Sequence, residues 1–141
     1  MKKICITGSL HWDIVVETNN IPKKDETVKG SKVNYLFGGK GGNQALSANR
    51  YGSNTYFIGR IGKDNFGGKI FNILKKSTVN IKQLQVGPEK TGMSVAIVDK
   101  KGNYNATIVS GANLNIDHKE IVIKKDTGIL LLQNEIPEKI N

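Results

Sequence analysis

The sequence predicts an α/β protein in which a partial central sheet is flanked by helices and carries a small second β-sheet. Continuous apolar runs at residues 4–7 and 128–133 are typical of strands buried on both faces of a parallel sheet. Segments with helical periodicity and segments that alternate like half-exposed strands lie between them. Because strand and helix signals follow one another along the chain, an α/β fold with an added flap is expected.

Length and charge limit the possible functions. The chain has 141 residues, of which 38% are hydrophobic and 23% charged, as in a globular protein with one domain. The formal net charge of +9 comes almost entirely from lysines scattered in ones and twos, since only Arg50 and Arg60 are arginines. Nucleic-acid surfaces favour arginine and aromatic side chains, so we expect no nucleic-acid partner.

Composition also bears on the cellular compartment. No apolar run approaches the length of a membrane span, and the run at residues 4–7 is too short for a signal peptide. The single cysteine, Cys5, excludes an internal disulfide, and its place in an apolar strand predicts a core residue. The sequence therefore predicts a cytoplasmic protein without a membrane contact.

The remaining elements follow from turn residues, caps and periodicity. Strands are expected at residues 4–7, 14–18, 27–37, 55–59, 91–98, 104–110 and 128–133. Helices are expected at 44–51, after the N-cap residue Asp64, and at 117–124. The turn at 99–103 joins two strands as a hairpin.

The stretch FGGKGGNQA, at residues 37–45, is the most distinctive feature. Its glycines allow positive φ and close approach of the backbone to a ligand. The N–H groups at the start of the following helix, with Lys40 beside them, suit an oxygen-rich or anionic ligand. A plain turn between a strand and a helix explains the glycines equally well.

This stretch carries neither of two known phosphate-binding motifs. The Gly-Lys pairs at Lys40, Lys63 and Lys69 are not followed by Ser or Thr, as a P-loop requires. A dinucleotide fingerprint that starts at Gly39 would need glycine or alanine where Gln44 stands.

Polar residues follow the carboxyl ends of two predicted strands. His11, Trp12 and Asp13 come shortly after the first strand, and Glu135 follows the strand at 128–133. Ligands of open α/β sheets bind outside the carboxyl ends of the strands, so these residues are candidates for a site. Asp13 as a turn or cap residue and His11 as a surface histidine remain alternatives.

Several spaced motifs resemble, in order and spacing, the N-terminal half of the ribokinase-like (PfkB) sugar kinases. They are GSLHWD at 8–13, GGKGGNQA at 38–45, GKDNFG at 62–67, TG at 91–92, SGAN at 110–113 and LQNE at 132–135. The resemblance runs from about residue 4 to the last residue. Several motifs that agree are more specific than any one of them.

The resemblance implies a Rossmann-like ribokinase fold and an ATP-dependent transfer of phosphate to a sugar hydroxyl. Residues 1–141 would form the N-terminal part of one such domain. The sugar or nucleoside would lie between the α/β part and a β-sheet lid, which in many members also forms a homodimer contact. The lid strands would lie at about 14–18, 27–37, 91–98 and 104–110.

The resemblance also implies a set of substrate-binding residues. Carried over position by position, they are His11, Asp13, Gly39, Lys40, Asn43 and Glu135. Asp13 would accept hydrogen bonds from sugar hydroxyls, and Glu135 would line the site at its strand end. His11 and Trp12 depart from ribokinases proper, which tend to have asparagine and a small residue there, so the identity of the sugar stays open.

Family members are longer than this chain, and their C-terminal half supplies the catalytic base, the anion hole and the residues around ATP and Mg²⁺. The Gly-Ala-Gly-Asp type motif of that half does not occur here. We therefore expect no catalytic, cofactor-binding or metal-binding residue in this chain, and no phosphate transfer by the chain alone.

Three hypotheses follow. The chain is the sugar-binding and lid half of a carbohydrate kinase, produced by truncation, a frameshifted gene or a split pair. Alternatively, it is one subunit of a kinase completed by a C-terminal partner chain, or a stand-alone sugar-binding or regulatory module. In each case the strand at 128–133 is expected to leave a sheet edge and apolar faces uncovered.

Overall fold

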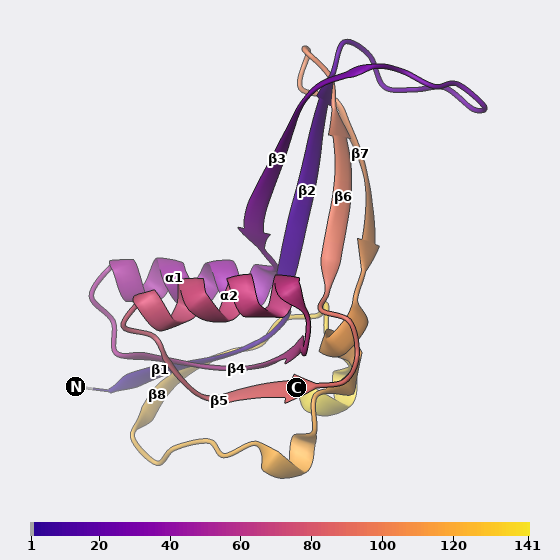
Figure 1. Ribbon diagram of the computed structural model, residues 1–141. Coiled ribbons are helices and arrows are strands. Elements are labelled where there is room, and N and C mark those ends of the chain that lie inside the picture. The colour runs from indigo at the N-terminus through magenta and orange to yellow at the C-terminus, as the bar shows by residue number, and fades with distance from the viewer. Residues whose placement is uncertain (1) are drawn as a thin grey trace.

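The structure, a computed structural model, describes residues 2–141 and contains two four-stranded sheets. The central sheet is parallel, has the order β5-β4-β1-β8, and consists of β1 (Lys3–Thr7), β4 (Thr55–Gly62), β5 (Asn80–Gly87) and β8 (Thr127–Leu131). The second sheet has the order β3-β2-β6-β7 and consists of β2 (His11–Thr18), β3 (Gly30–Gly38), β6 (Met93–Val98) and β7 (Tyr104–Val109). Figure 1 shows this second sheet, here called the projecting sheet, rising away from the central sheet.

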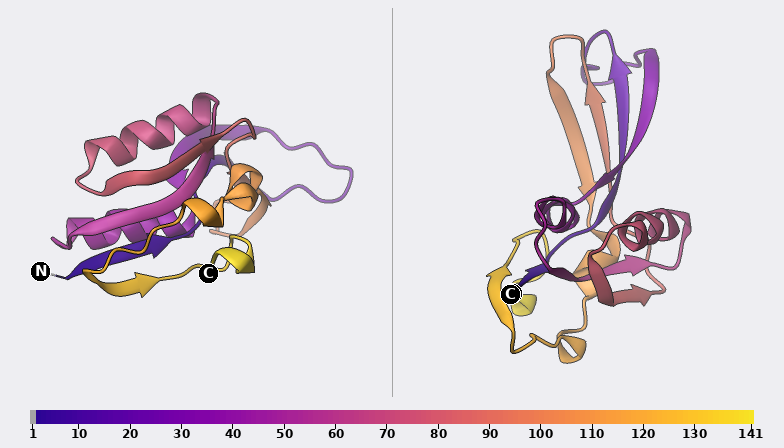
Figure 2. Two further views of the ribbon diagram at one scale, coloured as in Figure 1. Left: turned by 90° about the horizontal axis from the view of Figure 1, so that it is seen from below. Right: turned by 90° about the vertical axis from the view of Figure 1, so that its left-hand side faces the viewer.

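Both α-helices cover the same face of the central sheet. α1 (Lys40–Arg50) and α2 (Asn65–Lys76) lie above it in Figure 1, and the right-hand view of Figure 2 shows them side by side. The opposite face is crossed by the segment that contains the short 3-10 helices η1 (Gly111–Asn115) and η2 (His118–Glu120), and η3 (Glu138–Ile140) follows β8. None of the helices in residues 2–141 is long and apolar enough to cross a membrane.

The main core lies between the two helices and the central sheet. Ile6 and Phe57 from the sheet and Ile70 and Leu74 from α2 are all 0% exposed. The predicted core position of Cys5 is confirmed, since it too is 0% exposed and lies on the opposite face with Tyr56. The continuous apolar run at the start of the chain therefore does bury both faces of β1.

The predicted helix after Asp64 is confirmed. The Asp64 carboxylate accepts a hydrogen bond of 2.8 Å from the Gly67 N–H at the start of α2, which satisfies one of the free donors of the first turn. Lys75 and Lys76 lie in the last turn, where positive charge is favourable because the free carbonyls carry negative charge.

The helix expected at 44–51 begins earlier, at Lys40. Gly41 and Gly42 are helical, and of the glycines in this stretch Gly39 alone has a positive φ, of 88°. Close packing explains why the helix tolerates Gly41, because a Cβ there would lie 2.6 Å from the Gly8 carbonyl carbon. The glycines therefore allow α1 to pack closely against the end of β1, and they do not form a flexible loop.

One strand was missed and one expected helix is wrong. β5 was not predicted, since Gln83 and Gln85 break up its apolar residues. The helix expected at 117–124 is reduced to η2.

Side chains of β5 explain why that helix does not form. Gln83 pairs with the backbone of Val122, donating to its carbonyl at 2.9 Å and accepting from its N–H at 2.7 Å. Gln85 holds the backbone of Asp117 in the same way, at 2.9 and 2.8 Å. These contacts take the backbone groups that a helix would use.

The strand predicted at 128–133 is β8, which pairs in parallel with β1 as expected but is not buried. Ile129 is 53%, Leu130 43% and Leu131 36% exposed. β8 is one of the two edge strands of the central sheet, and its exposed apolar side chains agree with the uncovered edge expected from the sequence.

Candidate functional site

The candidate residues gather where the central sheet passes into the projecting sheet. Ser9 and Leu10 link β1 to β2, and the start of α1 packs directly on them. The Gly42 N–H donates to the Ser9 carbonyl at 3.0 Å. A Cβ at Gly39 would lie 2.6 Å from the same carbonyl oxygen, so this position requires glycine both for its positive φ and for space.

Glu135 joins this junction from the segment after β8. Its carboxylate accepts a hydrogen bond of 2.7 Å from the Ser9 hydroxyl, and Lys40 Nζ lies 2.9 Å from its other oxygen. Burial alone would raise the pKa of Glu135, but the hydrogen bond from Ser9 and the charge of Lys40 outweigh burial and lower it. Glu135 is therefore a carboxylate at neutral pH, held in a fixed orientation.

Asp13 lies in β2, half-buried, on the face of the projecting sheet that also carries Ser94. The Ser94 hydroxyl donates to Asp13 Oδ1 at 2.7 Å. The other oxygen, Oδ2, accepts no hydrogen bond from any residue within 2–141, and a Cβ at Gly38 would lie 2.1 Å from it. One carboxylate oxygen is thus fixed and the other is available to a ligand hydroxyl.

His11 begins β2 and is only 3% exposed. Its Nε2 has no hydrogen-bond partner in the part of the chain that the structure describes. Burial lowers the pKa of His11, although the charges of Glu135 and Asp13 oppose this, and Lys40 lowers it further. The imidazole is therefore neutral at pH 7 and can donate or accept one further hydrogen bond.

Asn43 occupies the first turn of α1 and is exposed. Its backbone N–H donates to the Gly39 carbonyl at 3.0 Å, as the first hydrogen bond of the helix. The structure therefore brings together five of the predicted residues, His11, Asp13, Gly39, Lys40 and Glu135, and places Asn43 on the adjoining helical turn.

Two buried amides were not identified from the sequence. Asn113, 0% exposed, accepts from the Leu10 N–H at 2.9 Å and donates to the Leu10 carbonyl at 2.8 Å. Gln133 accepts from the Ser9 N–H at 3.1 Å. Both fix the backbone that presents His11. The motifs SGAN and LQNE contain them, but sequence alone does not tell which of these polar residues is buried.

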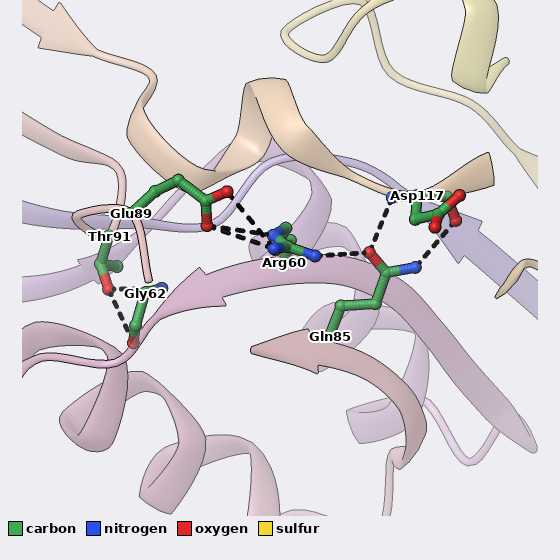
Figure 3. Close-up of polar contacts among 6 residues, drawn as sticks. All are labelled: Arg60, Gly62, Gln85, Glu89, Thr91 and Asp117. Carbon is green, nitrogen blue, oxygen red and sulfur yellow. Dashed lines mark hydrogen bonds and ion pairs between the residues drawn. The ribbon is translucent and has the colours of Figure 1, made fainter. Parts of the chain in front are cut away.

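A second polar cluster fixes the other crossing between the sheets, from β5 to β6 (Figure 3). Thr91 accepts from the Gly62 N–H at 2.9 Å. Its hydroxyl and its backbone N–H donate to the Asp64 carboxylate at 2.7 and 2.8 Å. Burial would raise the pKa of Asp64, but hydrogen bonds from Gly67 and Thr91 lower it. The start of β6 is thus tied to the start of α2.

Arg60 extends this cluster along the end of β4. It lies 3.3 Å from Glu89 in an ion pair whose side chains are 16% and 28% exposed, and it donates to Gln85 at 3.3 Å. Two cavities, of about 440 and 300 Å³, lie nearby against α2, and none of the six candidate residues lines either of them. The cluster around Arg60 and Thr91 therefore fixes the connection from β5 to the projecting sheet. The candidate residues lie elsewhere, where β1 and the segment after β8 meet β2.

Comparison with known proteins identifies the family. The pfkB family carbohydrate kinases match residues 1–131. Ribokinase from Bacillus subtilis is 34% identical over 145 residues, which cover 99% of this chain and 49% of that protein. Ribokinase from Arabidopsis thaliana is 34% identical over 146 residues, which cover 98% of this chain and 38% of that protein.

Solved structures agree. Ribokinase from Thermotoga maritima superimposes with a TM-score of 0.88 at 30% identity, covering 99% of this chain and 48% of that one. The structure of Arabidopsis thaliana ribokinase complexed with ribose and ATP gives a TM-score of 0.80 at 32% identity, over 99% and 47%. The chain thus spans about half or less of the relatives' length and corresponds to their N-terminal part. Fold and resemblance are confirmed, and the chain belongs to the pfkB family of carbohydrate kinases.

Proposed function

We propose that this chain is the sugar-binding part of an ATP-dependent carbohydrate kinase and does not transfer phosphate by itself. One observation carries the proposal: Asp13 from the projecting sheet and Glu135, which follows β8 and pairs with Lys40 at 2.9 Å, both lie close enough to the buried His11 for their charges to act on it. Two fixed carboxylates, a cation and an unpaired imidazole suit a ligand with several hydroxyl groups.

In this proposal the projecting sheet acts as a lid over the sugar. The free Oδ2 of Asp13 accepts a hydrogen bond from a sugar hydroxyl, and His11 Nε2 supplies one further hydrogen bond. Gly39, Lys40 and Asn43 contact the sugar from the start of α1, and Glu135 contacts it from the segment after β8. Because each buried polar atom would lose a partner when a hydroxyl is missing, deoxy analogues should bind more weakly.

ATP and Mg²⁺ belong to the proposed whole kinase. Related ribokinase structures are described as complexes with ADP, from Cryptococcus neoformans, and with ribose and ATP, from Arabidopsis thaliana. Residues 2–141 contain no group of three or more His, Cys, Asp or Glu side chains placed to hold a metal ion. In this proposal the nucleotide and its metal bind to the part of the kinase that corresponds to the remaining length of the relatives, and phosphate transfer is assigned to no residue of this chain.

A second candidate function, one subunit of a split kinase, is favoured by the uncovered edge of β8. Three consecutive apolar residues there, at 129–131, are between 36% and 53% exposed, and the backbone of an outermost strand can pair with another strand. A partner chain that corresponds to the remaining part of the relatives would add a strand beside β8 and cover these side chains.

A third candidate, a stand-alone sugar-binding or regulatory module, would dimerise through the projecting sheet. Leu36, Tyr104 and Ile108 are 50%, 68% and 52% exposed, and they share the sheet face that carries Asp13. Burying such side chains favours association.

We also propose a cytoplasmic location, because the buried Cys5 is the chain's only cysteine and is left without a disulfide partner within the chain.

The decisive experiment is a thermal melt of the purified chain with D-ribose, hexoses, nucleosides or ATP–Mg²⁺. A ligand that binds only the folded state raises the melting temperature. We expect a sugar or nucleoside to do so and ATP–Mg²⁺ to have no effect. An increase with ATP–Mg²⁺ alone would contradict the proposal.

Asp13→Ala tests the assignment of the site. This variant should still melt cooperatively but lose the increase with sugar, because the ligand's hydroxyl loses its charged acceptor. Glu17→Ala is the matched control, since Glu17 lies on the same strand and face four residues further from the junction. Unchanged sugar binding by Asp13→Ala would show that Asp13 does not contact the sugar.

A further inference from the structure

The back of the projecting sheet is held by α2 through Trp12. Neighbouring residues of a strand point to opposite faces, so Trp12 faces away from His11 and Asp13 on either side of it. Its ring stacks on Phe66 of α2, with centroids 6.3 Å apart and planes at 22°. Trp12 is 7% exposed, so this contact is part of the core.

Lys69, three residues after Phe66 on α2, completes the contact. Its Nζ lies 5.2 Å from the centroid of the Trp12 ring and 5.7 Å from that of Tyr35. A cation within about 6 Å of a ring centroid is attracted by the electrons of the ring face. Lys69 takes part in none of the ion pairs found within residues 2–141, so no carboxylate competes for its charge.

This arrangement bridges two strands of the projecting sheet. Trp12 belongs to β2 and Tyr35 to β3, and Tyr35 is paired with Ile14, two residues along from Trp12 on the same face. One ammonium group on a helix of the main body therefore contacts both strands at once. Such a contact resists movement of the strands relative to α2.

The indole has no other polar contact to orient it. A buried tryptophan N–H usually finds a hydrogen-bond acceptor, but Trp12 Nε1 has none among the described residues. Stacking on Phe66 and the charge of Lys69 therefore fix the ring. The Trp12 backbone N–H donates to the Gly92 carbonyl at 2.9 Å, just before β6, so a shift of Trp12 would move the start of β6 as well as β2.

We propose that Lys69 is a positioning residue. Its ammonium group over Trp12 and Tyr35 fixes the base of the projecting sheet against α2 and so sets the positions of His11 and Asp13. Lys69 thereby affects sugar affinity without touching the sugar. The effect on sugar affinity rests on the proposed function, whereas the effect on the sheet does not.

The single tryptophan of the chain makes this directly measurable. We would compare acrylamide quenching of Trp12 fluorescence and the affinity for D-ribose, or for another sugar that raises the melting temperature, in the unmodified chain and in Lys69→Met. Methionine keeps an unbranched apolar side chain and removes only the charge. Lys69 is exposed, so the variant should fold.

Lys69→Met should increase quenching and lower sugar affinity about two- to fivefold, as expected for the loss of an exposed cation–π contact. Lys69→Arg should restore both, because guanidinium also stacks on aromatic rings. Lys75→Met is the matched control, since Lys75 lies 6.0 Å from the ring centroid of Phe71 on the same helix. It should change neither measurement.

Unchanged quenching in Lys69→Met would overturn the inference, and so would increased quenching with unchanged sugar affinity. If the unmodified chain binds none of the sugars tested, the proposed function fails. The quenching of Lys69→Met then decides by itself whether Lys69 fixes the projecting sheet.

Discussion

The strands on either side of β1 in the central sheet, β4 and β8, differ in how far their side chains are buried. Ile6 in β1 pairs with Phe57 on one side and with Leu131 on the other. Phe57 is 0% exposed beneath the helices, whereas Leu131 is 36% exposed at the outer strand. Residues of similar character in one row of the sheet thus have opposite environments. Residues 2–141 therefore bury the apolar side chains of β4 beneath the helices and leave those of β8 exposed.

The candidate site lies on the boundary between these two sides. Ser9 belongs to the connection from β1 to β2, and it is held by Gln133 and Glu135, which follow the exposed strand β8. The candidate residues on β2 and at the start of α1 therefore lie on well-packed elements, whereas Glu135 follows the exposed edge strand β8. Covering β8 should make the position of Glu135 more exact, since burial restricts the movement of neighbouring groups.

The largest expected difference between the two sides comes from core truncation. Phe57→Ala should lower the free energy of unfolding by about 3–5 kcal/mol, because it leaves a cavity under both helices. Leu131→Ala should cost less than about 1 kcal/mol, because solvent already reaches that side chain. Urea unfolding followed by Trp12 fluorescence measures both. Similar losses in the two variants would mean that β8 is covered in solution, by a second copy of the chain or another partner.

Asn113→Ala tests how firmly the boundary is held. It would leave the buried N–H and carbonyl of Leu10 without partners, at a cost of about 2–4 kcal/mol of unfolding free energy. Asn72→Ala, at an exposed position of α2, should have little effect. If Asn113→Ala unfolds at the same urea concentration as the unmodified chain, the junction does not depend on this amide.

Asp64→Ala examines the packed side at the start of α2. Loss of the helix cap and of the contacts with Thr91 should cost about 1–2 kcal/mol at neutral pH. The pKa of Asp64 is lowered in the folded chain, so its stabilisation is present above its ordinary pKa and is lost as pH falls through the lowered value. The difference between variant and parent should therefore shrink in acid, and a constant difference would argue against the carboxylate's role.

The smallest expected effect is the pH dependence due to His11. Its pKa is lowered from the ordinary value of 6.5, so below that value the unfolded chain binds a proton that the folded chain does not. Stability should then fall as pH decreases from about 7 toward 5, and His11→Asn should flatten this decline. Glu135, Asp13 and Lys40 are the charged groups that act on His11. An equal decline in His11→Asn would assign it to other groups.

Local signals predicted much of the fold. The Asp64 cap, the apolar runs of β1 and β8 and the turn at 99–103 each depend on residues close in sequence, and each is found in the structure. β5 was not predicted because Gln83 and Gln85 interrupt its apolar residues and leave only a weak alternation of apolar and polar side chains. Both glutamines hydrogen-bond to the backbone of a distant segment, at Val122 and Asp117. The same hydrogen bonds hold the backbone at residues 117 and 122, where a helix was expected over 117–124.

The sequence by itself determined the family and the residues proposed for the site, because glycine motifs and spaced polar residues are local properties of the chain. Tertiary structure decided which buried polar atoms find partners. Asn113 holds Leu10 across 103 positions and Gln133 holds Ser9 across 124. Such pairing arises only when segments far apart in the chain meet, so no local pattern could specify these contacts.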